Sequence, residues 1–135
     1  DSKVLASLPA FLEVGSPGRR SVPRRMGFGS NQLAEVDNLL RFASPTPDTP
    51  LVLAGDFNTA PGSPAYARLL DAGLVDPCAA GADVGTAQFF HLRMHIDHLF
   101  STPAVHWRSA WAHSVDAGAF RGLSDHAPKI GRLAA

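Results

Sequence analysis

Three short polar clusters combine residue types that can carry out acid–base or metal-assisted chemistry. They are GDFN at residues 55–58, IDH at residues 96–98 and SDH at residues 124–126. The first two follow or open expected strands, and the third comes just before the closing one. Loops at strand ends are where a rigid sheet presents reactive groups. We therefore expect the functional side chains to come from these three places.

The chemistry that each cluster offers can be stated residue by residue. Asp56 and Asn58 are two apart, so on extended backbone they point to the same side and together can hold a water and a phosphate or carbonyl oxygen. Asp125 is a hard oxygen ligand of the kind that Mg²⁺ prefers. His126 can act as a general acid or base, or donate to an anionic transition state. Its second ring nitrogen needs a partner, and Asp97 is the candidate if the two strands are neighbours.

Two of these clusters also have a plain structural interpretation. Gly-Asp-Phe-Asn can form an Asx turn with no further role, because Asp after a strand is a common turn former. Asp125 and His126 can cap a loop. The triad of a serine hydrolase is discounted for residues 124–126, since adjacent residues on extended backbone point in opposite directions.

The elements that must position these clusters alternate along the chain. Ser30 is expected to cap a helix over residues 31–43, and Ser63 a helix that starts with Pro64 and ends before Gly73. Strands are expected within residues 2–14, 51–54, 89–101 (centred on 96–100), 107–115 and 127–133, with loops at 15–29, 55–62, 74–88 and 118–122. This order predicts a mixed α/β fold (α/β, α+β) with one mixed sheet and helices on one face.

Composition limits the alternatives. The chain has 135 residues, which suits one small domain or part of a larger one. Its formal net charge is zero, which argues against a strongly basic nucleic-acid module. No apolar run is long enough to cross a membrane, and the single cysteine, Cys78, excludes an internal disulfide and a cysteine-built metal site.

Taken together, three segments resemble the second half of the endonuclease/exonuclease/phosphatase superfamily. They read GDFNTAPGSPAYARLLDAGLVD, HIDHLFSTP and GLSDHAPKIGRL, and the resemblance runs from about Asn31 to Leu133. It implies that residues 1–135 are a single partial domain, the C-terminal half of such a domain. The fold would then be half of a four-layer α/β/β/α sandwich whose site lies between two sheets.

The same resemblance implies Mg²⁺-dependent hydrolysis of a phosphoester, with Mn²⁺ as an alternative ion. Asp56 would orient or deprotonate the attacking water, Asn58 would hold the scissile phosphate, and Asp125 would belong to the metal site. His126 would contact the phosphate, with Asp97 fixing its ring. The substrate classes implied are nucleic acid, phospholipid headgroups and inositol phosphates.

The chain departs from the family pattern in its first part. The family supplies an Asn near its start and a metal-binding Glu further on, and no segment here matches either. Glu35 is expected on the solvated face of its helix, and Phe11 stands where the family often has a histidine. We therefore expect the site to be complete only with an N-terminal half that supplies Asn and Glu, which leaves the activity of the isolated chain open.

Three other interpretations fit parts of the sequence. The chain can be a non-catalytic half-domain that binds a partner through an uncovered sheet face, since large apolar patches mark interfaces. His91, His95 and His98 can be taken as a zinc site, but the glutamate of a zincin is Leu92 here, so this is disfavoured. The loop at residues 15–29, rich in Arg, Gly and Pro, can contact phosphates, but a solvated loop is favoured.

Overall fold

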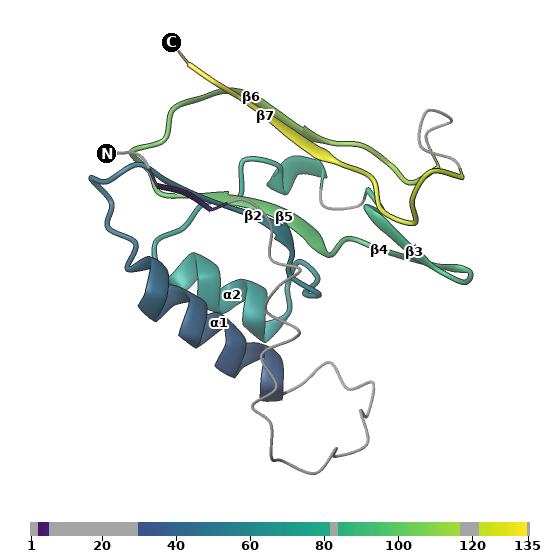
Figure 1. Cartoon of the computed structure of the whole chain (residues 1–135), viewed down its shortest axis with the longest axis horizontal. Coiled ribbons are helices and arrows are strands. Elements are labelled where there is room, and N and C mark those ends of the chain that lie inside the picture. The colour runs from purple at the N-terminus through teal and green to yellow at the C-terminus, as the bar shows by residue number, and fades with distance from the viewer. Residues whose placement is uncertain (1–2, 6–29, 82–83, 117–121, 135) are drawn as a thin grey trace.

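The computed structural model describes residues 3–5, 30–81, 84–116 and 122–134. Its elements are β1 (Lys3–Leu5), α1 (Ser30–Ala43), β2 (Leu51–Asp56), α2 (Pro64–Asp71), a 3₁₀ turn (Ala79–Gly81), β3 (Ala87–Phe89), β4 (Leu92–Met94), β5 (Asp97–Ser101), β6 (Trp107–Ala112) and β7 (Lys129–Leu133) (Figure 1). The arginine-rich loop at 15–29 and most of the first expected strand lie outside the described residues. The expected mixed α/β class is confirmed.

The strands form three small sheets rather than the single sheet expected. The central one has the order β1-β2-β5 and is mixed, because β1 runs parallel and β5 antiparallel to β2. The pairs β3-β4 and β6-β7 are separate antiparallel sheets. The expectation of one sheet was wrong because strand spacing along the chain does not determine which strands share hydrogen bonds.

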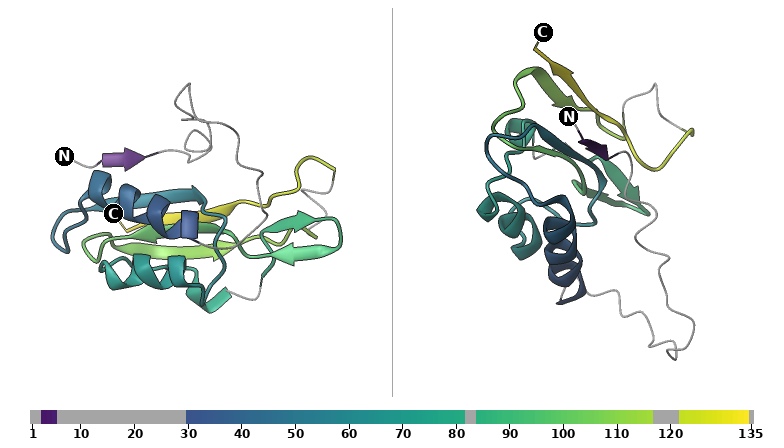
Figure 2. Two further views of the ribbon diagram at one scale, coloured as in Figure 1. Left: turned by 90° about the horizontal axis from the view of Figure 1, so that it is seen from below. Right: turned by 60° about the vertical axis from the view of Figure 1, so that its left-hand side comes forward.

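Both helices lie on one side of the central sheet, as expected, and the β6-β7 pair lies on the other (Figures 1 and 2). Leu51 and Leu53 alternate along β2 and are buried with Phe100 of β5, which is 0% exposed. Against them pack apolar side chains of α1 and α2: Val36, Leu39, Ala65, Tyr66 and Leu69. The alternation of β2 and the helical spacing of α1 and α2 thus meet in one core.

The opposite face of β5 is covered by β7. Leu99 is only 8% exposed. A side chain at Gly131 would bring its Cβ within 2.9 Å of the Leu99 Cδ2 atom, so only glycine permits this approach. The uncovered sheet face on which the partner-binding hypothesis depends is therefore absent at β5.

The ends of the second helix follow their sequence signals. The Oγ atom of Ser63 accepts a hydrogen bond from the Tyr66 N–H at 3.2 Å, and Pro64 occupies the first helical position. Gly73, just past the end, has φ +83°, a left-handed conformation that favours glycine. The first helix differs slightly, because Ser30 is its first residue and not the cap before it. Glu35 on this helix is exposed, as expected.

The strand expected over residues 89–101 is divided. Phe89 closes β3, a turn at Phe90 and His91 leads into β4, and β5 begins only at Asp97. Phe90 has φ +53° although it is not one of the usual turn residues, so no composition signal marked this hairpin. The loop expected over residues 74–88 therefore overlaps the first two residues of β3. The last two strands are shorter than expected at one end each.

No helix among the described residues is long and apolar enough to cross a membrane.

The core makes a direct prediction about stability. Changing Phe100→Ala should lower the free energy of unfolding by about 3–5 kcal/mol, because it leaves a cavity between the helices and the sheet. The matched control is Phe42→Ala on α1, where the side chain is 69% exposed, and its effect should stay within about 0.5 kcal/mol. Denaturant unfolding measures both. Equal effects of the two changes would contradict the packing described.

Candidate active site

The pairing of β2 with β5 places two carboxylates side by side. Asp56, the last residue of β2, lies opposite Asp97, the first residue of β5. Directly opposite residues share a face of the sheet, so the two acids are neighbours. Burial raises the pKa of Asp56 above its ordinary value, and the charge of Asp97 adds to the rise. The site therefore concentrates negative charge at one end of the central sheet.

The SDH motif at residues 124–126 is connected to this end of the central sheet through β3. Ala87 forms an isolated β-bridge with His126, and the Gln88 N–H donates to the Asp125 carbonyl at 2.8 Å. The Ala127 N–H donates to the Thr86 carbonyl at 2.7 Å. These backbone bonds hold the loop before β7 against the hairpin, so the position of His126 is set by the sheet.

His126 and Asp97 form the pair that the sequence suggested. The Nδ1 atom of His126 lies 3.0 Å from each carboxylate oxygen of Asp97. The His126 side chain is 35% exposed and that of Asp97 16%. With Nδ1 engaged, Nε2 is the nitrogen that can face a ligand, and the carboxylate fixes the orientation of the ring.

The surrounding carboxylates alter the titration of His126. Partial burial alone would lower the pKa of this imidazole, but the hydrogen bond to Asp97 and the charges of Asp97, Asp56 and Asp125 outweigh it. The pKa of His126 is therefore raised above the ordinary 6.5. A histidine that keeps its proton nearer neutral pH can donate to an anionic group.

We expected Asp56 and Asn58 to lie on continuous extended backbone, and this expectation was wrong. β2 ends at Asp56, and Asn58 has φ +49°. The Asn58 N–H donates to Asp56 Oδ1 at 2.8 Å, so the turn interpretation of this motif is also present in the structure. Gln32 of α1 donates from Nε2 to the Asn58 carbonyl, which ties the turn to the first helix.

Asp125 presents its carboxylate at the surface beside His126. The residue is exposed, and its charge contributes to the raised pKa of His126. The Ser124 Oγ accepts the His126 N–H at 3.0 Å, which shapes the local turn. The structure thus brings Asp56, Asp97 and Asp125 within electrostatic reach of His126, and Asn58 adjoins them through its backbone bond to Asp56.

A second cluster lies inside the molecule and contains two of the three histidines considered for zinc, His95 and His98, with Asp76 in place of the exposed His91. Asp76, His95 and His98 bring ligand-type atoms within 4.8 Å of one another, with Lys129 beside them. Burial raises the pKa of Asp76, but the hydrogen bond to His98 and the charge of Lys129 outweigh it, so the pKa is lowered. Burial also lowers the pKa of Lys129. No spacing signal connects Asp76 to His98, because they are 22 positions apart.

Comparison with protein families identifies the family of the chain. The family model for the endonuclease/exonuclease/phosphatase family matches residues 8–126. The chain therefore belongs to this family, whose members hydrolyse phosphoester bonds. A search of curated proteins found no match.

Solved structures show the same fold. A 3′ phosphatase NExo from Neisseria, bound to a product DNA hairpin, has a TM-score of 0.58 and 21% identity; the match covers 77% of this chain and 52% of that one. A mannosyl-6-phosphatase from Bacteroides thetaiotaomicron has a TM-score of 0.55 and 21% identity, with 80% of this chain and 48% of that one covered. The chain thus spans about half the length of these structures.

The Asp97–His126 pair makes a testable prediction. In Asp97→Asn the pKa of His126 should fall, because the change removes both the charge and the carboxylate acceptor. A raised folded pKa stabilises the fold fully below the unfolded pKa of about 6.5, and this contribution disappears as pH rises through the folded pKa. Asp97→Asn should therefore lose stability mainly at acidic to neutral pH.

Proton NMR titration of the His126 ring measures the pKa change directly. Asp37→Asn serves as the control, since Asp37 bonds Arg68 on the helical side and should leave the His126 pKa in place. A His126 pKa that is the same in Asp97→Asn and in the unchanged chain would contradict the pairing.

Proposed function

We propose that this chain carries the second half of the active site of a Mg²⁺-dependent phosphoester hydrolase. The single observation that supports it best is the hydrogen bond of His126 to Asp97, formed beside Asp56 and Asp125. Family membership supports the reaction class, and the closeness of these four side chains supports its assignment to this end of the central sheet.

The donor set fits a hard divalent cation. Asp125 offers an exposed carboxylate, and Asp56 a half-buried one. Mg²⁺ is usually held by one or two carboxylates together with waters and substrate phosphate. When bound, such an ion neutralises charge on the phosphoryl oxygens; Asp125 is the residue proposed to hold it, and Mn²⁺ suits the same oxygen ligands.

The remaining residues act on the substrate and the water. Protonated His126 would donate from Nε2 to a phosphoryl oxygen, with Asp97 keeping the ring oriented. Asp56, whose pKa is raised, would orient the attacking water and accept its proton. Asn58 would hold the scissile phosphate, which requires its side chain to turn toward His126 from the bend after β2.

The proposal includes a requirement for further residues. The chain spans about half of the similar structures, and it shows no counterpart of the family's Asn and Glu. We propose that an N-terminal half of the domain supplies them and that full activity needs both halves. The substrate would be a phosphoester of a nucleic acid, a phospholipid headgroup or an inositol phosphate.

The proposed roles can be tested by substitution. In the complete protein, Asp125→Ala and His126→Ala should each reduce phosphoester turnover by at least ~100-fold, as expected for groups that stabilise developing charge. Glu35→Ala is the control, because Glu35 is exposed on α1 and has no place in the site. The measurement is kcat with a chromogenic phosphodiester and a phosphomonoester. Turnover near that of the unchanged protein in either active-site variant would contradict the assignment.

Metal dependence gives a separate prediction. Turnover of the complete protein in buffer freed of divalent ions should be at background, and Mg²⁺ added alone should restore it, because the Asp56 and Asp125 carboxylates would repel an anionic phosphate unless a divalent cation neutralises the charge. Mn²⁺ should also restore turnover. Ca²⁺ should restore less of it, because Ca²⁺ takes more ligands at longer distances in a less regular geometry than Mg²⁺. Unchanged turnover without any divalent ion would refute the Mg²⁺ role.

A further inference from the structure

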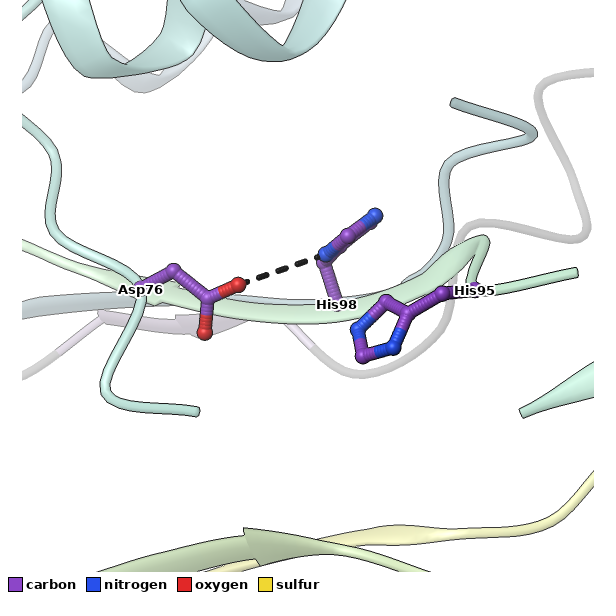
Figure 3. Close-up of side chains that lie close together, drawn as sticks. All are labelled: Asp76, His95 and His98. Carbon is purple, nitrogen blue, oxygen red and sulfur yellow. Dashed lines mark hydrogen bonds and ion pairs between the residues drawn. The ribbon is translucent and has the colours of Figure 1, made fainter. Parts of the chain in front are cut away.

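The buried cluster formed by Asp76, His95 and His98 lies beside β5, where His98 contacts Tyr66 of α2 and Lys129 of β7 lies next to Asp76. The Asp76 and His98 side chains are 1% and 0% exposed, and Asp76 Oδ2 lies 3.4 Å from His98 Nδ1. His95 is 7% exposed, and its ring lies 5.1 Å from that of His98. Figure 3 shows a ring nitrogen of His95 turned toward the Asp76 carboxylate and the His98 ring.

Backbone carbonyls determine which ring nitrogens carry hydrogen. His95 Nδ1 lies 2.7 Å from the Val84 carbonyl, and His98 Nε2 lies 2.7 Å from the Thr59 carbonyl. A carbonyl oxygen can only accept, so both of these nitrogens donate. A neutral His95 ring then has its lone pair on Nε2, and this atom and His98 Nδ1 are the two ring nitrogens left for the cluster.

This arrangement leaves one ring nitrogen of the cluster without a donor, away from water. His95 Nε2 is buried and has no hydrogen-bond partner among the described residues. His98 Nδ1 faces a carboxylate oxygen, and the 3.4 Å separation is longer than the 2.7–2.9 Å or so of a charge-assisted hydrogen bond. A buried acceptor without a donor is costly, so a cation that all three groups can share would stabilise the cluster.

We propose that Asp76, His95 and His98 bind one divalent transition-metal ion of the Zn²⁺ type, at a site separate from the Mg²⁺ site at Asp125. Two imidazole nitrogens and one carboxylate oxygen are a ligand set that suits Zn²⁺ and not Mg²⁺. Each histidine donates its other nitrogen to a backbone carbonyl, as metal-bound histidines commonly do.

The geometry needs only a modest adjustment. Tetrahedral Zn²⁺ with bonds of about 2.1 Å has ligand atoms about 3.4 Å apart. The Asp76–His98 separation already has this value, and the widest separation in the cluster is within 4.8 Å. A small movement of His95 closes the site. Asp76 is held in place because Oδ1 accepts the Cys78 N–H at 2.7 Å and Oδ2 accepts the Tyr66 hydroxyl at 3.2 Å.

Lys129 is the natural competitor for this position. Its Nζ lies 3.8 Å from Asp76 Oδ2, is buried, and forms no hydrogen bond among the described residues. An ammonium group so close repels a second cation. The flexible Lys129 side chain must move away when the metal binds, and removing its charge should strengthen metal binding.

Metal binding at the buried cluster would also affect the position of Asp97 through the backbone of residues 95–98. Asp97 lies between His95 and His98 in the sequence, and its carboxylate holds His126 on the other face of β5. A metal ion at the buried cluster would join the segment after α2 to this strand and so make Asp97 a better-fixed partner. The inference does not depend on the proposed hydrolase function.

The test is Co²⁺ titration of the full chain, stripped with a chelator, followed by displacement with Zn²⁺. We expect one equivalent of Co²⁺ with the visible absorption of a tetrahedral site, and Zn²⁺ binding with a Kd at or below about 1 μM. His95→Gln should weaken Zn²⁺ binding by at least ~10-fold, while the matched control His91→Gln, at the exposed hairpin turn, should stay within about twofold. Lys129→Met should tighten binding by at least ~3-fold.

Several results would overturn the proposal. One is no saturable Co²⁺ binding below about 100 μM in either the unchanged chain or Lys129→Met. Others are equal losses in His91→Gln and His95→Gln, or loss of the Co²⁺ signal in Asp125→Asn, which would place the ion elsewhere. If His95→Gln does not fold, the comparison of the unchanged chain with Lys129→Met decides. Mg²⁺-dependent turnover can fail while this site binds Zn²⁺, so the two proposals are distinguishable.

Discussion

The register between β2 and β5 is the constraint on which the rest of the site depends. It sets Asp56 opposite Asp97 at the end of the central sheet. A slip of one residue would turn every side chain of β5 to the other face, exchanging Asp97 with His98. Burial on both sides of β5 resists such a slip, with Phe100 in the helical core and Leu99 against β7. The apolar packing therefore determines where the polar chemistry lies.

As a result, two adjacent residues of β5 lie in two different environments. Asp97 faces the half-exposed His126, whose raised pKa suits an anion-binding role. His98 faces the helical side, where it contacts Tyr66 and Asp76 out of reach of water. The exposed pair can exchange protons with substrate and solvent, whereas the buried group has to be neutralised within the protein. This difference is why we assign a phosphate-facing role to one and a soft-metal role to the other.

The sequence predicted the parts of the fold that depend on local chemistry. The caps of α2 follow from residue types at known spacings, and β2 follows from a short apolar run. The closeness of Asp97 to His126 was expected because a working histidine needs a partner for its second nitrogen. The β3-β4 hairpin was missed because Phe90 takes a left-handed conformation without a usual turn residue. The separation into three sheets and the partnership of Asp76 with His98 depend on tertiary packing, which no spacing along the chain encodes.

The central claim is that a hard divalent ion sits at Asp125 within reach of His126. The most direct test adds Mn²⁺, with inorganic phosphate, to the full chain and follows paramagnetic broadening of the histidine ring signals by NMR. We predict that the His126 signals broaden first, while those of His106, at the far end of the β6-β7 pair, stay sharp, and that Asp125→Asn abolishes the difference. Uniform broadening of both, or broadening that persists in Asp125→Asn, would contradict the claim.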